Sequence, residues 1–123
     1  MAKPPAPSVQ IFGLPDSQPT RAALRFFKER RWTVVFNDLR RRPIAPGELR
    51  RFVERLGARS VADTQGRTWH DAGLDYLRMD DAELAERLLV DARLLRLPLV
   101  RFGNEVTAGP SEAVWKGWLT DRR

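Results

Sequence analysis

The beginning of the chain alternates between extended and helical patterns, and this alternation constrains the fold more than any other feature. Val9–Gly13 is a short apolar run that ends at a glycine, so it predicts a strand. From about Pro19 to Arg30, apolar residues fall at helical spacing among charges, and Pro19 suits the first turn of a helix. β-branched and aromatic residues then fill Trp32–Asp38, a second strand. Strand, helix and strand at this length predict a βαβ unit with parallel pairing.

The next segment predicts a helical insert. In PIAPGELRRFVERLG the apolar positions follow the i, i+3, i+4, i+7 pattern of one helix face, and Gly57 is the expected stop; these positions are Leu49, Phe52, Val53 and Leu56. The segment SVADTQGRTWHDAGLDYL has turn chemistry. A further amphipathic helix is expected from Asp81 to about Leu95, capped by Asp80 or Asp81.

The last part of the chain predicts a hairpin and a helix. Two short apolar strands between Pro98 and Ala108 flank Gly103-Asn104, which is a hairpin signal. Pro110 opens a final helix whose inner face is expected to hold Val114, Trp115, Trp118 and Leu119. The order β α β, helical insert, β β α predicts an α/β fold with a four-stranded mixed sheet flanked by helices. We expect one domain over residues 9–120, with the insert at about 46–95.

Composition excludes several classes of protein. The chain has no cysteine, which excludes disulfides, thiolate metal sites and thiol catalysis by this chain itself. It has a single histidine and scattered carboxylates, so we expect no metal site and no cofactor. No apolar run approaches the ~20 residues that cross a bilayer, and the first residues lack the apolar core of a signal peptide. We therefore expect a cytoplasmic protein without membrane association, with residues 1–8 as a disordered tail.

The positive charge of the chain is concentrated in its first half. Residues 1–60 hold 13 basic and 5 acidic residues, whereas residues 61–123 hold 9 basic and 11 acidic ones. The run RRR at 40–42 and the segment LRRFVER are the densest basic stretches. They are interpreted either as solvated surface or as a site for phosphate or an acidic protein partner.

The stretch FGLPDSQPTRAAL raises the question of a functional site, because small polar residues open the first helix there. Ser17 suits the N-cap position, where its hydroxyl accepts a backbone N–H. The free N–H groups of the first turn, with Ser17, Gln18, Thr20 and Arg21, are a candidate anion site for phosphate or sulfate. A catalytic Ser17 needs an adjacent base, and His70 is the single histidine available, in a distant block of the sequence.

Four blocks of the sequence resemble a known family. The stretches QIFGLPDSQPTRAALRFFKER, FNDLRRRPIAPGELRRFVERLG, TQGRTWH and LLRLPLVRFGNEVTAG are similar, in order and spacing, to blocks of the arsenate reductase-like (ArsC/Spx) family. The resemblance runs from about Val9 to Leu119. It implies a thioredoxin-like fold with a helical insert. It also implies a cis Leu97–Pro98 peptide bond beside Ser17.

The same resemblance implies that the reductase site has changed. Ser17 stands where the family places its nucleophilic or redox-sensing cysteine. Gln65 and His70 stand where the family block Arg-Gly-Thr-Thr-Trp/Tyr-Arg has its first and last arginines. Leu97 replaces the arginine that precedes the third-strand proline and helps to hold the oxyanion, so the expected pocket wall is Gln65, His70, Leu97 and Pro98.

Two classes of function follow. In the first, the chain is a non-catalytic interaction or regulatory protein with at most a relic anion pocket; the resemblance to Spx implies RNA polymerase as one partner, and the basic first half suits an acidic partner. In the second, it is an arsenate reductase-like or glutathione-linked oxidoreductase or transferase that uses an external thiol. Direct nucleic-acid binding is the least supported option, because no reading element is recognised and the second half is acidic. The oligomeric state is left open.

Overall fold

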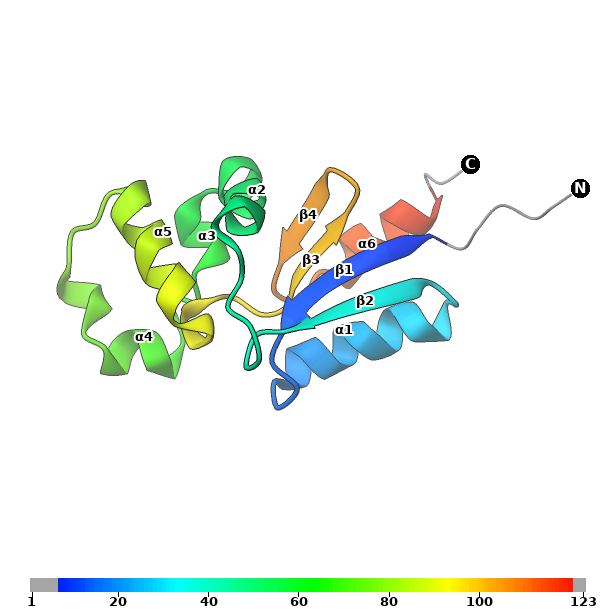
Figure 1. The fold of residues 1–123 in the computed structure, drawn as a ribbon, viewed down its shortest axis with the longest axis horizontal. Helices are drawn as coiled ribbons and strands as arrows, with labels where there is room; N and C mark the ends of the chain where they lie inside the picture. The colour runs from blue at the N-terminus through cyan, green and yellow to red at the C-terminus, as the bar shows by residue number, and fades with distance from the viewer. Residues whose placement is uncertain (1–6, 121–123) are drawn as a thin grey trace, which may run out of the picture.

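The computed structural model describes residues 7–120 and contains one four-stranded mixed sheet (Figure 1). The strand order is β2-β1-β3-β4; the strands are β1 (Ser8–Gly13), β2 (Thr33–Asp38), β3 (Leu99–Phe102) and β4 (Glu105–Ala108). β1 pairs with β2 in parallel, and the other two pairings are antiparallel. This confirms the predicted thioredoxin-like α/β fold. The predicted tail lies mostly outside the described residues.

Helices cover both faces of the sheet, and the insert extends beyond one end of it (Figure 1). α1 (Gln18–Glu29) and α6 (Glu112–Thr120) pack on one face, and α2 (Pro46–Leu56) packs on the other. The rest of the insert consists of α3 (Ala58–Val61), α4 (Arg67–Asp71), α5 (Asp81–Val90) and two short 3-10 helices at Leu74–Tyr76 and Ala92–Leu94. Within the described residues no helix is both long and apolar enough to span a bilayer.

Strand alternation divides the interior into two cores. Val9 and Ile11 point to α1 and α6, where they meet an aromatic cluster of Phe26, Phe27, Trp32, Trp115 and Trp118. Phe12 and Leu99 point to the opposite face, where Phe12 meets Phe52 of α2 edge to face at 5.9 Å between ring centroids. Burial on both faces therefore fixes the register of β1, since a shift by one residue would exchange its two faces.

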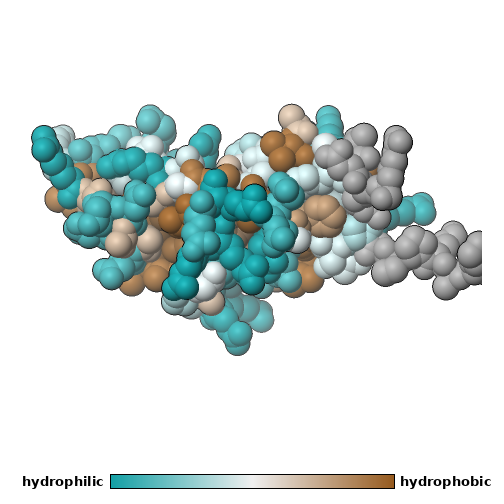
Figure 2. Space-filling view, turned by 90° about the horizontal axis from the view of Figure 1, so that it is seen from above, coloured by the Kyte–Doolittle hydropathy of each residue, from teal (hydrophilic) through white to brown (hydrophobic). Residues whose placement is uncertain are grey.

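Local signals set most of the helix ends. Asp80 caps α5 in a capping box with Glu83, as one of the two aspartates was expected to do. Gly57 ends α2 with a φ of +86°, a conformation that suits glycine. The outer surface seen in Figure 2 is largely hydrophilic over α2, with smaller hydrophobic patches between the polar side chains.

Two local predictions were wrong. α5 ends at Val90 rather than near Leu95, because Asp91 is extended and its side chain accepts the N–H of Arg93 at 2.9 Å, which starts a 3-10 turn instead. Val114 is 49% exposed rather than on the inner face of α6. The buried stripe runs through Trp115 and Trp118, and Val114 lies roughly a quarter turn from its centre.

Candidate functional site

Ser17 is the N-cap of α1. Its Oγ accepts the backbone N–H of Thr20 at 3.3 Å, and its own N–H donates to the carbonyl of Leu14 at 2.9 Å. Its carbonyl accepts the first helical bond, from Arg21 N at 3.0 Å. The hydroxyl is therefore engaged in holding the start of the helix, as the cap interpretation predicts.

A shallow pocket of about 310 Å³ opens beside Ser17 and is called the Ser17 pocket below. It is lined by Leu14, Asp16, Ser17, Pro19, Asp63, Arg93, Leu95 and Leu97. Two acidic residues and one arginine therefore line the same small space. The partial positive charge of the N-terminus of α1 adds to the guanidinium, but the carboxylates still oppose a multiply charged anion.

The four predicted anion ligands lie in different surroundings, and among them Ser17 alone lines this pocket. Gln18 lines a separate cavity of about 160 Å³ between α1 and the start of α6. Thr20 is fully buried, and its Oγ1 lies against Gly13 without a hydrogen-bond partner among the described residues. Arg21 is exposed and donates from its guanidinium to the carbonyl of Pro15 at 3.1 Å. Anion binding at this helix start stays a prediction.

The expected pocket wall is also divided. Leu97 lines the pocket, and the Leu97–Pro98 peptide bond is cis, as expected. Gln65 lies exposed in the turn before α4 and is not among the lining residues. His70 is not among them either, and its Nδ1 pairs with Asp75 Oδ2 within the insert. Asp75 also accepts the indole N–H of Trp69 at 2.9 Å, so this aspartate orients both rings.

Sequence reasoning missed Asp63 and Arg93, which supply charge to the Ser17 pocket. They are brought together by an isolated β-bridge between Ala62 and Leu95 and by a bond from Asp63 N to the carbonyl of Leu94 at 2.8 Å. The two residues lie thirty positions apart, and no motif spacing connects them. Their proximity depends on tertiary packing of the insert, which carries no local sequence signal.

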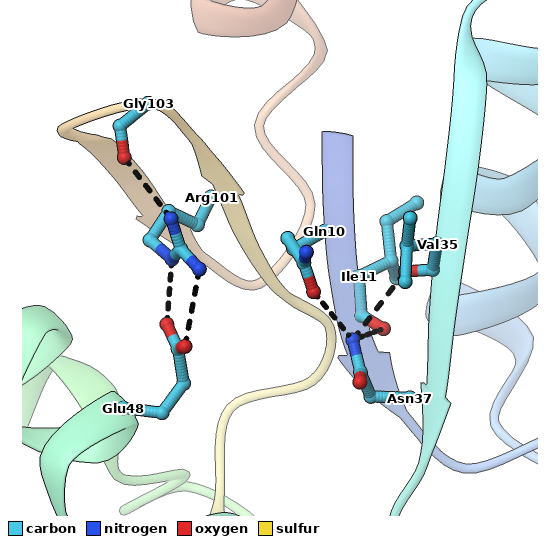
Figure 3. Close-up of polar contacts among 7 residues, drawn as sticks. All are labelled: Gln10, Ile11, Val35, Asn37, Glu48, Arg101 and Gly103. Atoms are coloured by element: carbon cyan, nitrogen blue, oxygen red, sulfur yellow. Dashed lines mark hydrogen bonds and ion pairs between the residues drawn. The ribbon is translucent and has the colours of Figure 1, made fainter. Parts of the chain in front are cut away.

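A larger cleft of about 740 Å³ lies beside β2, on the sheet face where α2 begins, and is called the β2 cleft below. Its lining includes strand residues Gln10, Phe12, Phe36, Asn37, Asp38 and Arg101, loop residues 39 and 41–45, and Glu48 of α2. Figure 3 shows the polar contacts that join different elements at this cleft. Arg101 donates to both carboxylate oxygens of Glu48, at 2.6 and 3.1 Å, and Asn37 Nδ2 donates to Gln10 Oε1 at 3.0 Å.

Both carboxylates of the β2 cleft are paired with arginines. Glu48 and Arg101 are 18% and 19% exposed, so their bidentate pair is largely removed from water. Arg40 binds Asp38 through its side chain at 3.1 Å and through its backbone N–H at 2.9 Å. The side-chain hydrogen bond from Arg40 is the main cause that holds the pKa of Asp38 below its ordinary value. Arg41 and Arg42 also line the cleft and form no direct ion pair with a described residue, although Arg41 adds a smaller electrostatic contribution to the lowered pKa of Asp38.

Comparisons with known proteins agree with this architecture. Among solved structures, the YffB protein is 18% identical, with 89% of this chain and 96% of that chain covered and a TM-score of 0.82. Arsenate reductase from Vibrio cholerae is 20% identical, with 91% and 98% covered and a TM-score of 0.78. An arsenate reductase (ArsC) related protein from Brucella melitensis is 17% identical, with 95% and 98% covered and a TM-score of 0.69. These likenesses establish the fold. No curated protein sequence is similar enough to match the chain.

The family model for the ArsC family matches residues 12–117. This span includes the start of α1, the whole helical insert and the cis-proline strand, and hence every residue that lines the Ser17 pocket. The sheet order, the insert and the family match agree with one another, and the chain belongs to the ArsC family.

Proposed function

We propose that this chain is a non-catalytic member of the ArsC family that acts as an interaction or regulatory protein in the cytoplasm. The observation that carries the proposal is the chemistry at the start of α1. The sequence contains no cysteine, and the side chain at the expected nucleophile position is the hydroxyl of Ser17. A hydroxyl has no thiol redox chemistry, and it is a poor nucleophile without an adjacent base.

The surroundings of Ser17 support the same proposal. The Oγ of Ser17 already accepts the N–H of Thr20, and His70 pairs with Asp75 rather than lining the pocket. Leu97 stands where the family resemblance implies an arginine for the oxyanion. Asp16 and Asp63 bring two carboxylates to the pocket, which disfavours the binding of arsenate and leaves at most a relic anion site.

A second candidate function keeps the pocket as an enzyme site. Arg93 lines the Ser17 pocket together with the N-terminus of α1, and the two could hold an anionic substrate while an external thiol such as glutathione supplies the nucleophile. In that case the chain would be an arsenate reductase-like or glutathione-linked oxidoreductase or transferase. For the non-catalytic alternative, the partner would be an acidic protein, with RNA polymerase as one candidate by analogy with Spx.

An arsenate reduction assay separates the two candidates. Purified wild-type chain is incubated with arsenate and either glutathione or thioredoxin with its reductase, with the arsenate reductase from Vibrio cholerae as the positive control. We expect no arsenite formation above the background of the thiol alone, because no residue of this chain can attack arsenate and become oxidised. Turnover by the wild type that saturates with arsenate would overturn the non-catalytic proposal.

A further inference from the structure

We propose that the free edge of β2 is a docking site for an extended acidic peptide segment of a partner protein, which adds to the sheet as a fifth strand. This inference rests on the proposed interaction role and names the surface and the chemistry of its partner. Four observations support it: the backbone groups of β2 that point away from β1, the absence of a proline, a lysine or a bulge within the strand, the arginines at both ends of the strand, and the cleft that adjoins it.

The first observation is the direction of the backbone groups of β2. Thr33 N donates to Pro7 O at 2.8 Å and Leu39 N donates to Gly13 O at 3.0 Å, so the residues at odd positions turn their N–H groups toward β1. Val34 and Phe36 therefore turn their N–H and C=O groups away from the sheet. No side chain of a described residue bonds to them. Two consecutive pairing positions are thus open to an incoming strand.

The second observation is the lack of protection. Proteins blunt their sheet edges with proline, lysine, bulges or a covering element. β2 has no proline or lysine, its one charged residue, Asp38, is bound by Arg40, and its pairing with β1 is continuous from Thr33 to Asp38 without a bulge. Its substantial contacts are with β1 and α1, whereas the opposite edge strand, β4, is packed against α2. At roughly 3.3 Å per residue, β2 offers an edge of about 20 Å.

The third observation is charge. Arg30 and Arg31 precede β2, and residues 40–42, all arginines, follow it. Arg31, Arg41 and Arg42 form no direct ion pair with any described residue. The single carboxylate within the strand, Asp38, is already bound by Arg40. A peptide with acidic residues toward both ends would therefore meet a free cation at each end, whichever direction it ran.

The same charges decide against a second copy of this chain as the occupant. In an antiparallel pairing of two β2 strands, Arg31 of one copy would lie near Arg41 of the other. In a parallel pairing, Arg31 of one copy would lie near Arg31 of the other, and Arg41 near Arg41. Either arrangement brings like charges together across the new pairing, which is destabilising. The arginines thus oppose self-association at this edge while favouring an acidic partner.

The fourth observation is the position of the β2 cleft. Phe36, Asn37 and Asp38 of β2 line it together with Arg41, Arg42 and Ile44. A peptide strand alternates its side chains between the two faces of a sheet. Every second side chain of the added strand would therefore point to the face that holds the cleft, where Arg41 and Arg42 can pair with the carboxylates of an acidic peptide.

The first test uses a fluorescein-labelled seven-residue peptide in which glutamate and valine alternate, with the matching lysine and valine peptide as the charge control. Fluorescence anisotropy should show saturable binding of the acidic peptide and none of the basic one. The double variant Arg41→Glu, Arg42→Glu should lower the affinity at least about tenfold, because it reverses both cations of the cleft. The double variant Arg59→Glu, Arg87→Glu makes the same change in net charge on the insert and should change the affinity less than about threefold.

The second test asks whether the peptide pairs as a strand. Two forms of the acidic peptide are compared, one N-methylated at its valines and one at its internal glutamates. Because alternate N–H groups of a strand face opposite edges, one form should lose binding and the other should keep it. Bound peptide should also slow hydrogen exchange at the amides of Val34 and Phe36.

Several results would overturn the inference. Equal loss of binding in both methylated peptides, or in neither, would contradict strand addition. Slow exchange at Val34 and Phe36 that depends on protein concentration without peptide would assign the edge to a second copy. Tighter binding of a single-stranded oligonucleotide that is sensitive to Arg41 and Arg42 would assign it to a nucleic acid. Failure to bind the peptide leaves the non-catalytic proposal standing, whereas arsenate turnover overturns that proposal whatever the peptide does.

Discussion

The Ser17 pocket lies between the start of α1 and the insert, whereas the β2 cleft lies on the sheet, and the two sites differ in how their charges are balanced. In the Ser17 pocket, two carboxylates, Asp16 and Asp63, face one guanidinium, that of Arg93. In the β2 cleft, each carboxylate is paired with its own arginine, and Arg41 and Arg42 have no direct ion pair with a described residue. The β2 cleft therefore carries a local excess of arginine, whereas acidic residues outnumber the single arginine in the Ser17 pocket. This difference makes the β2 cleft, and not the Ser17 pocket, the better surface for an acidic partner.

The largest expected effect concerns the rate of arsenate reduction in an engineered Ser17 pocket. Ser17→Cys alone should give little or no turnover, because Asp16 and Asp63 oppose the single guanidinium of the pocket, that of Arg93, and leave the developing oxyanion without a net positive partner. Ser17→Cys combined with Leu97→Arg should be faster by a factor of about 10²–10³, since position 97 lines the pocket and one electrostatic donor has that effect on rate. Single-turnover kinetics with arsenate and glutathione measure the difference.

Two further variants test the cause of that effect. Ser17→Cys with Leu97→Gln carries a polar side chain of similar size without charge, and it should stay close to the single variant. Adding Gln65→Arg should contribute less than Leu97→Arg, because Gln65 does not line the pocket. Full activity in the Ser17→Cys single variant would contradict the contrast between the two sites, since it would mean that the pocket already holds the charge it needs.

The next effect concerns the stability of the β2 cleft. Glu48→Gln should lower the free energy of unfolding by about 2 kcal/mol, because it leaves the largely buried guanidinium of Arg101 without its charged partner. Asp71→Asn is the matched control in the exposed pair Arg67–Asp71, whose side chains are 93% and 71% exposed, and it should change stability by less than about 0.5 kcal/mol. Urea denaturation at neutral pH measures both. Equal losses of stability in the two variants would mean that the Glu48–Arg101 pair stabilises the fold no more than an exposed ion pair does.

The smallest effect concerns the role of Ser17 as a cap. Ser17→Ala should destabilise the chain by about 0.5–2 kcal/mol, because the N–H of Thr20 loses its acceptor. The binding of the acidic peptide to β2 should not change, because Ser17 does not line the β2 cleft. Thermal unfolding and anisotropy titration are the two measurements. An unchanged unfolding temperature would remove the structural role assigned to the hydroxyl and reopen the case for a functional one.

Local patterns were sufficient to predict the four strands, the helices α1, α2 and α6 and the cap at Ser17, but not the end of α5 or the short helices of the insert. These predictions depend on strand alternation, helical periodicity and capping chemistry, and each of these signals involves only a few neighbouring residues. The helical periodicity also indicates that Thr20 is buried, which the hypothesis of an anion site did not take into account. Thr20 precedes Ala23 by three positions and Phe27 by seven, so it falls on the buried stripe of α1 and turns away from the helix start.

The residues that line the Ser17 pocket and the β2 cleft were harder to predict from the sequence. Asp63 and Arg93 meet through packing of the insert, and Arg101 meets Glu48 across fifty-three positions, so neither pair has a spacing that a motif could reveal. Gln65 and His70 were assigned to the pocket wall by resemblance alone. The turn before α4 and the contact of His70 with Asp75 place them elsewhere.

The positions of the four tryptophans allow unfolding of the sheet core and of the insert to be followed separately by intrinsic fluorescence. Trp32, Trp115 and Trp118 lie in the core between the sheet, α1 and α6, whereas Trp69 lies in the insert, and all four are buried. A Trp69→Phe variant would therefore emit from the sheet core alone, and its difference from the wild type would isolate the emission of the insert. Unfolding followed at these two signals would reveal whether the insert and the sheet melt as one cooperative unit or as two.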